Sequence, residues 1–270
     1  MTDPDLQALA PLRAQLAQCH RQLADMAAAH EDFLRGVSHD LRAPLRHITS
    51  YGPLVTELLQ EAGAAPLSAE SIEEALEFLA TMEQSARRMG QMLDGLLVLS
   101  RIGRAVLQIQ PVALYPLVAQ VQTTLAASSQ GRTVQWHINP HLPTVQGDAA
   151  LLQQMLTELM GNALKFTRGR DPAQITITAE QGASGGVMLQ VQDNGAGFNP
   201  AQSAGLFGVF QRLHRESEFE GVGTGLAMVR AIAQRHGGDA SATAAVGQGC
   251  TVCVVWPGCA SPVFMPLPYA

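Results

Sequence analysis

The sequence contains no apolar run that approaches the length of about 18 residues needed by a membrane-spanning helix, and its N-terminus has no basic leader. Its four cysteines, Cys19, Cys250, Cys253 and Cys259, do not have the spacing of a zinc site. The arginines are scattered and the formal net charge is -6, which argues against a nucleic-acid partner. These absences predict a cytoplasmic chain without a membrane span, with free and buried thiols.

Two common nucleotide-binding motifs are absent as well. The chain has no Gly-x-x-x-x-Gly-Lys-Ser/Thr P-loop, and its glycine spacing fits no dinucleotide-binding fingerprint. Lysine is almost missing, because Lys165 is the only lysine among 17 basic residues. A flexible point charge suits contact with phosphate, whereas an ordinary surface position in this chain is an arginine. Lys165 is therefore a candidate phosphate-binding residue.

The first part of the chain has the pattern of long helices. From Leu9 to Val37 apolar positions alternate in steps of three and four, which is typical of a coiled-coil seam. The apolar stripe is narrow, and this favours dimerisation over a single helix that lies on its own domain. The same helix is expected to continue to about Glu61.

A second long helix is expected after the breaker at 61–66. Ser71 and Glu74 offer a capping box for its start, and apolar residues at helical spacing continue to about Ile102. Two antiparallel helices in each chain, paired across a dimer, predict a four-helix bundle.

The second half changes to short strands that alternate with helices. Strands are expected at Val106–Gln110, Thr133–Ile138, Gln174–Glu180, Val187–Asp193, Asp239–Ala244 and Cys250–Trp256. Helices are expected near Leu114–Ala127, Ala149–Thr167 and Gly225–His236. This pattern predicts an α/β sandwich. The whole chain is thus expected to be α+β, with a dimeric four-helix bundle, one two-helix hairpin per chain, followed by the sandwich.

His39 lies beside a carboxylate in the segment 37–45, which reads Val-Ser-His-Asp-Leu-Arg-Ala-Pro-Leu. Asp40 can accept a hydrogen bond from one ring nitrogen, which leaves the other nitrogen free as a nucleophile. Pro44 removes a helical hydrogen bond and predicts a bend close to His39. The alternative is a solvated helix histidine, which is the commoner case for a histidine in isolation.

Further motifs follow in the second half. They are 158–167 (Glu-Leu-Met-Gly-Asn-Ala-Leu-Lys-Phe-Thr), 193–197 (Asp-Asn-Gly-Ala-Gly), 206–213 (Leu-Phe-Gly-Val-Phe-Gln-Arg-Leu), 221–226 (Gly-Val-Gly-Thr-Gly-Leu) and 247–251 (Gly-Gln-Gly-Cys-Thr). The segment 221–226 opens a helix, so its backbone N–H groups and the positive helix end can face phosphates.

These motifs, in this order, resemble those of sensor histidine kinases. The segment 37–45 resembles the phosphoacceptor box, and its amino-acid sequence is similar to that of phytochrome-type kinases. The motif that starts at Glu158 resembles the asparagine box, and 206–213 resembles the phenylalanine box of a mobile ATP lid. The motifs at 193–197, 221–226 and 247–251 resemble the glycine boxes. The resemblance covers about residues 33–257 and implies a Bergerat-type ATP-binding fold for the sandwich.

The resemblance also implies a site for ATP and Mg²⁺. The catalytic residues would be His39 and Asp40, the carboxamide of Asn162 would bind Mg²⁺, and Asp193 would accept the exocyclic amine of adenine. Glu158 would be a possible hydrolytic base. The implied ATP-binding residues are Asn162, Lys165, Phe166, Asp193, Gly195, Gly197, Phe210, Gly221, Gly223, Thr224, Gly225, Leu226 and Thr251.

The implied mechanism is attack of His39 on the γ-phosphate of ATP, followed by transfer of the phosphoryl group to an aspartate of a separate response regulator. The implied partners are this regulator, a second copy of the chain and a separate or excised sensory input domain. The expected domains are a coiled-coil signalling helix (1–32), a dimerisation and phosphotransfer domain (33–104), a catalytic ATP-binding domain (105–257) and a Pro-rich tail (258–270).

Two residues depart from the family pattern. Ala43 stands where many members have Thr or Asn and cannot orient a hydrolytic water, which weakens the expectation of phosphatase activity. Glu158 occupies the position of a general base in related ATPases, whereas many histidine kinases have Asn there. Two alternatives stay open: a Bergerat ATPase whose turnover survives His39→Gln, and a scaffold that dimerises and binds nucleotide without chemistry.

Overall fold

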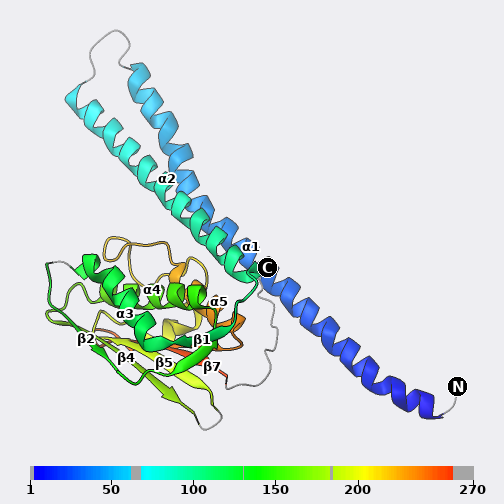
Figure 1. Cartoon of the computed structure of the whole chain (residues 1–270). Coiled ribbons are helices and arrows are strands. Elements are labelled where there is room, and N and C mark those ends of the chain that lie inside the picture. Colours follow the sequence, from blue (N-terminus) through cyan, green and yellow to red (C-terminus); the bar gives the residue numbers. More distant parts are fainter. Residues whose placement is uncertain (1–2, 62–67, 130, 183–184, 258–270) are drawn as a thin grey trace. The chain divides into compact units, whose positions relative to one another are not determined.

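The computed structural model describes residues 3–61, 68–129, 131–182 and 185–257 (Figure 1). Their contacts divide the chain into two compact units, one that ends at Met82 and one that begins at Glu83. The division falls inside a single helix, α2 (Ala69–Arg104). Among the described residues, no helix has the length and apolar character that crossing a membrane requires. The predicted α+β class is confirmed, because a helical region precedes an α/β sheet region.

The first unit contains α1 (Asp3–Glu61) and the start of α2. The ring of Tyr51 on α1 stacks on that of Phe78 on α2, with centroids 5.0 Å apart. Val55, one helical turn after Tyr51, is buried. The predicted long helix and its helical partner are thereby confirmed. Helix α1 continues through Pro44, and the bend that this residue predicts stays a prediction.

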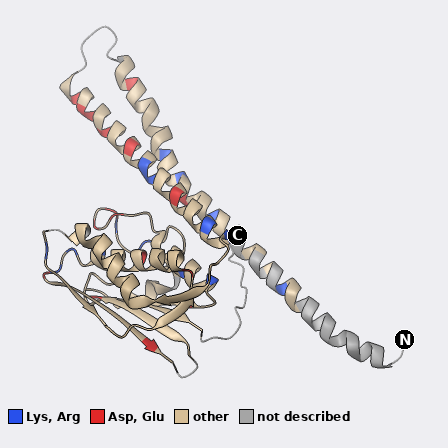
Figure 2. Ribbon diagram, in the orientation of Figure 1, with Lys and Arg blue, Asp and Glu red and all other residues tan. Residues whose placement is uncertain are grey.

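The start of α2 differs from the expectation. The backbone N–H of Ser71 donates to Oγ of Ser68 at 3.1 Å, and the N–H of Ile72 donates to the Ser68 carbonyl, so Ser68 caps the helix. The predicted capping box at Ser71 and Glu74 is therefore wrong, because the helix already begins at Ala69. Acidic residues lie near the N-terminal end of α2, and arginines lie in its last turn (Figure 2). Both positions interact favourably with the helix dipole.

The second unit is built on a five-stranded sheet with the strand order β2-β4-β5-β7-β6 and a separate two-stranded sheet of β1 and β3. The strands are β1 (Gln110–Ala113), β2 (Val134–Ile138), β3 (Thr144–Gly147), β4 (Ala173–Gln181), β5 (Val187–Asp193), β6 (Asp239–Ala245) and β7 (Gly249–Trp256). The helices are α3 (Leu114–Leu125), α4 (Ala149–Phe166) and α5 (Gly225–Arg235), with 3-10 turns η1 (Ala126–Ser129) and η2 (Pro200–Gly205). In the large sheet β2 and β4 are parallel and the other pairs are antiparallel.

Helices α3, α4 and α5 cover one face of the large sheet (Figure 1). Apolar residues alternate along β4 and β5, and Ile175, Ile177 and Leu189 are fully buried. They share a core with α4, whose residues Leu152 and Met160 are also fully buried. The core therefore lies between the sheet and the helical layer, and it fixes α4 beside the ends of the central strands.

Three expectations about the second half and the cysteines need correction. The strand expected at Val106–Gln110 is absent: the only strand there is β1, which starts at Gln110, and Val106 is 89% exposed. Strand β3 was not anticipated, because its four residues carry little periodic signal. Cys19 is exposed rather than buried. Cys250 and Cys253 are free and partly buried, and Cys259 lies outside the described residues.

Candidate active site

The side chain of His39 projects from α1 and is 83% exposed. Its Nδ1 lies 3.1 Å from Oδ1 of Asp40. A carboxylate can only accept a hydrogen bond, so Nδ1 carries the proton and Nε2 keeps its lone pair. The pair is thus arranged as the motif predicts, with an exposed imidazole whose ring is oriented by Asp40.

Helix α4 positions the side chains of the asparagine-containing motif. The helix starts where it does because the Asp148 carboxylate accepts hydrogen bonds from the N–H groups of Ala150 and Leu151, at 3.0 and 3.2 Å. About three to five helical turns further on, Glu158, Asn162 and Lys165 line one cleft with a volume of about 290 Å³. The structure therefore brings these three predicted residues together.

The charged groups in this cleft are partly buried. Burial raises the pKa of Glu158, and the nearby Lys165 ammonium opposes the rise. Burial lowers the pKa of Lys165, and the charge of Glu220 is the largest opposing influence. A Cβ on Gly225 would lie 2.4 Å from Oε2 of Glu158 and 3.5 Å from Nδ2 of Asn162, so both side chains face the start of α5.

The donor set of this cleft fits Mg²⁺. Glu158 and Asn162 offer a carboxylate and a carboxamide oxygen, which are the hard ligands that Mg²⁺ takes together with phosphate oxygens. The described residues contain no group of three or more His, Cys, Asp or Glu that would bind a metal on its own. The ion would therefore be held by the Asn162 carboxamide together with a nucleotide, with the Glu158 carboxylate in the same cleft.

Asp193 ends β5 and is buried, with 8% of its surface exposed. Burial raises its pKa from 3.8 to about 6, although hydrogen bonds from the backbone N–H groups of Gly195 and Cys250 lower it. The Gly195 bond is 2.8 Å long. Asp193 is thus a fixed acceptor at the end of the sheet, next to Phe166, whose carbonyl accepts from the N–H of Ala196 at 3.1 Å.

The glycine motifs at 193–197 and 247–251 meet beside Asp193. Gly197 has a φ of +60°, and a Cβ there would lie 2.0 Å from the Ala245 carbonyl oxygen. Gly249 has a φ of +90°, and its Cβ would lie 1.8 Å from the Asp193 carbonyl oxygen. Side chains at these positions are excluded by backbone, which accounts for glycine at both.

A pair of glycine variants tests this packing. Gly247→Ala introduces a side chain at a φ of +74° but into open space, where the nearest atom is an Arg170 nitrogen at 4.0 Å, so we expect a loss of about 1 kcal/mol in the free energy of unfolding. Gly249→Ala adds a clash with the strand that carries Asp193, and we expect a loss of at least about 3 kcal/mol. Urea unfolding measures both, and equal losses would contradict the close approach.

The segment between the glycine motifs resembles a lid that is anchored by aromatic residues. Phe207 and Phe210 are buried, whereas Leu213 is only partly so. Phe210 has a φ of +62°, and its N–H donates to the Gly223 carbonyl at 2.9 Å. A non-glycine residue in this conformation needs support, and the bond to Gly223 ties the lid to the glycine motif at 221–226.

The start of α5 carries the remaining glycine motif. Gly221 and Gly223 have φ values of +116° and +82°, and Thr224, which caps the helix, makes no side-chain capping bond. The cap therefore supplies no side-chain acceptor to the first N–H groups of α5, and Gly225 at its start lies beside Glu158 and Asn162. This arrangement suits binding of phosphate.

Thr251 lies one position beyond Cys250 on β7, opposite Gln192 of β5. The residue opposite Asp193 is Cys250, whose N–H donates to Asp193 and whose thiol pKa is raised to about 12 by burial and by the Asp193 charge. Sequence reasoning missed Cys250, because only the strand register reveals this neighbour. Thr251 stays a predicted site residue.

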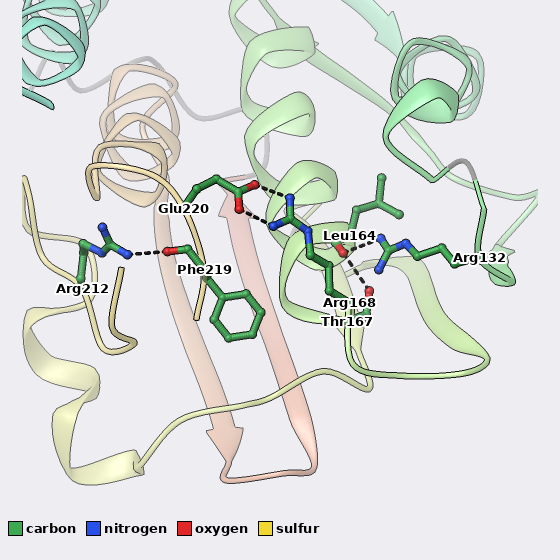
Figure 3. Close-up of polar contacts among 7 residues, drawn as sticks. All are labelled: Arg132, Leu164, Thr167, Arg168, Arg212, Phe219 and Glu220. Atoms are coloured by element: carbon green, nitrogen blue, oxygen red, sulfur yellow. Dashed lines mark hydrogen bonds and ion pairs between the residues drawn. The ribbon is translucent and has the colours of Figure 1, made fainter. Parts of the chain in front are cut away.

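Three other charged residues of the cleft were not anticipated: Arg132, Arg168 and Glu220. Arg168 makes a two-pronged ion pair with Glu220, and Arg132 donates to the Leu164 carbonyl at 2.6 Å (Figure 3). None of these three residues lies within one of the motifs identified in the sequence. Their only sequence signal is the position of Arg168 directly after the asparagine-containing motif.

Comparisons with known proteins agree with this geometry. Residues 29–105 match the family described as the His Kinase A (phospho-acceptor) domain. Residues 147–259 match the family described as histidine kinase-, DNA gyrase B-, and HSP90-like ATPase. The first range contains His39, and the second contains Glu158, Asn162 and Lys165 of the cleft.

Curated relatives are longer than this chain. Drug sensory protein A of Synechocystis sp. is 28% identical over 239 residues, which is 84% of this chain and 35% of that protein. Cyanobacterial phytochrome A of Nostoc sp. is 30% identical over 241 residues, which is 88% of this chain and 30% of that protein. The chain thus spans about a third of the length of the relatives it matches.

Two solved structures are similar over most of the chain. Full-length ShkA, crystallised with AMPPNP, is 27% identical with a TM-score of 0.53, and the match covers 86% of this chain and 47% of that one. The histidine kinase ThkA, crystallised with the response regulator protein TrrA, has a TM-score of 0.60 at 17% identity, with 92% of this chain and 66% of that one covered. At this identity the second likeness concerns the fold alone.

Proposed function

The chain belongs to the sensor histidine kinases, whose transmitter core it carries, and we propose that it transfers the γ-phosphoryl group of ATP to Nε2 of its own His39. The observation that carries the proposal is the His39 side chain, which is 83% exposed with Nδ1 held by Asp40. A nucleophile oriented in this way fits the phosphoacceptor role better than that of a solvated surface histidine.

The proposed transfer needs little proton movement. The lone pair on Nε2 of His39 attacks the γ-phosphorus, and the bond from phosphorus to the β–γ bridging oxygen breaks, so that ADP leaves with the electron pair. The ring becomes positively charged, and the Asp40 carboxylate stabilises that charge through Nδ1–H. Lys165 and the N–H groups at the start of α5 hold the phosphates.

Mg²⁺, when bound at Asn162, would neutralise part of the charge on the phosphates. Asp193 would select adenine by accepting from its exocyclic amine, since its carboxylate is fixed by the N–H groups of Gly195 and Cys250. The AMPPNP complex of ShkA supports an adenine nucleotide as the ligand of this fold.

The partners follow from the same proposal. Phosphorylated His39 would pass its phosphoryl group to an aspartate of a response regulator, and the complex of ThkA with TrrA supports a partner of this kind. Large apolar side chains on α1 and the start of α2 are between 39% and 60% exposed, and a second copy of the chain would cover them in a four-helix bundle. They are Leu34, Leu45, Leu54, Leu59, Ile72, Leu76 and Leu79. The cytoplasmic location stays a prediction.

Incubation with γ-labelled ATP and Mg²⁺ tests the proposed function. We expect the chain to take up label in a form that acid removes and alkali leaves in place, as a phosphoramidate does. Stable labelling in acid would indicate a phosphoester and contradict the histidine acceptor. Binding of nucleotide without any label would favour a scaffold.

A second activity, hydrolysis of ATP, is favoured by the environment of Glu158. Its carboxylate lies in the cleft, and burial raises its pKa, which makes it a stronger base than an exposed glutamate. We expect slow phosphate release by the chain to fall at least about tenfold in Glu158→Gln, measured by a coupled phosphate assay. Release that is unchanged in this variant would exclude Glu158 as the base.

A further inference from the structure

An acidic side chain reaches into the cationic part of the cleft. Three cationic residues, Arg132, Lys165 and Arg168, line the cleft together with the acids Glu158 and Glu220. Arg168 follows the end of α4, and Glu220 comes from the lid segment that precedes α5. Both terminal nitrogens of Arg168 contact the two carboxylate oxygens of Glu220 (Figure 3). A carboxylate of the lid thus lies in the cleft in which we place the phosphates.

Glu220 acts on more than one cation. The hydrogen bond from Arg168 lowers the pKa of Glu220, and the charges of Arg168 and Lys165 lower it further. For Lys165, Glu220 is the largest influence that opposes the lowering of its pKa by burial. Arg132 adds another positive charge near Arg168. Without Glu220 these cations would require another anion, and phosphate matches a guanidinium as well as a carboxylate does.

The backbone around Glu220 is held in place. Arg212 donates from one terminal nitrogen to the Phe219 carbonyl and from the other to the Gly221 carbonyl, so it grips the chain on both sides of Glu220. The Phe219 ring packs edge-on against Phe166 with centroids 5.0 Å apart. The chain on both sides of Glu220 is therefore held by neighbours on the lid and on α4.

We propose that Glu220 is an internal stand-in for the phosphates of the nucleotide, and that Arg168 is a phosphate-binding residue that exchanges the Glu220 carboxylate for a phosphate oxygen. The inference rests on the nucleotide binding of the proposed function, not on phosphoryl transfer to His39. Because the lid segment 219–221 is tied in part by this ion pair to the segment that follows α4, nucleotide binding would also release the lid at this point.

Binding of AMPPNP with Mg²⁺, measured by titration calorimetry, tests the competition. Glu220→Gln removes the competing charge, and because the ion pair is partly exposed, with side-chain accessibilities of 52% and 63%, we expect AMPPNP to bind about two- to fivefold more tightly. Glu218→Gln is the matched control, since Glu218 lies on the same lid and accepts from the Arg215 N–H instead. We expect no change in its affinity for AMPPNP.

Arg168→Gln tests the phosphate contact. We expect AMPPNP affinity to fall about fivefold or more, with adenosine binding, followed by NMR titration, unchanged because adenosine has no phosphate. In the double variant Arg168→Gln/Glu220→Gln the gain from Glu220→Gln should be largely lost. Thermal unfolding of each variant checks that the fold is retained.

Several outcomes would overturn the inference. Equal or weaker AMPPNP binding in Glu220→Gln would mean that Glu220 does not compete, and equal losses for AMPPNP and adenosine in Arg168→Gln would mean a structural role. No AMPPNP binding by the parent chain would overturn this inference and the proposed function together. Normal binding with no label on His39 would overturn the kinase alone, and the variants would still decide the roles of Glu220 and Arg168.

Discussion

We expect His39→Gln to abolish acid-labile labelling by γ-labelled ATP while AMPPNP binding stays unchanged. Glutamine has a similar length but no nucleophilic nitrogen, so no phosphoramidate can form. The side chain is 83% exposed, and its replacement leaves the packing of α1 intact. Labelling, nucleotide affinity and thermal unfolding, measured on the same preparation, check the three parts of this expectation.

Two further variants sharpen the result. His47→Gln changes another exposed histidine two turns along α1, and its labelling should match that of the parent chain. Asp40→Asn keeps an oxygen near Nδ1 of His39 but removes the charge, and we expect labelling to slow by about tenfold or more. Label that persists in His39→Gln would place the acceptor elsewhere in the chain.

We expect Asp193→Asn to weaken AMPPNP binding by at least about a hundredfold. The carboxamide oxygen can still accept from the Gly195 N–H, which now bonds to Oδ1 at 2.8 Å, so the nitrogen is directed toward the base. A donor would then face the exocyclic amine of adenine, which is also a donor. Calorimetric titration measures the loss, and affinity within threefold of the parent would show that Asp193 does not read adenine.

The same substitution should stabilise the fold at alkaline pH. Asp193 has a folded pKa of about 6 against an ordinary value of 3.8, so the folded state binds the proton more tightly than the unfolded state. The stability of the parent chain relative to Asp193→Asn therefore decreases as the pH rises from about 4 to above about 6, by up to about 3 kcal/mol. Urea unfolding at pH 5 and pH 8 checks this, and a constant difference would contradict it.

Most elements could be predicted from the sequence because their signals are local. Strand β5 begins and ends where alternation of apolar residues predicts, and α4 and α5 agree with their expected bounds to within a residue or two. The misplaced strand near Val106 shows the limit of this reasoning. Its alternation is real, yet no partner strand lies beside it until Gln110, and a strand is defined by its partner.

The motif residues of the candidate site were also predictable, since they follow one another in a family order. Glu158, Asn162 and Lys165 are separated by four and three residues, so helical spacing alone places them on one surface. His39 and Asp40 are chain neighbours, and the motif itself links them. The start of α2 was less predictable, because Ser68 and Ser71 are both suitable caps and only the observed hydrogen bond distinguishes them.

By itself, the sequence determined the class of the protein and the set of nucleotide motifs, and it predicted the acceptor histidine, because these depend on residue type and order along a helix or a turn. Only the tertiary structure decided which residues meet across elements. The strand register puts Cys250 rather than Thr251 opposite Asp193, and folding of the lid joins Arg168 to Glu220, 52 positions later in the chain. Contacts of this kind arise from packing between distant segments, and no local pattern encodes them.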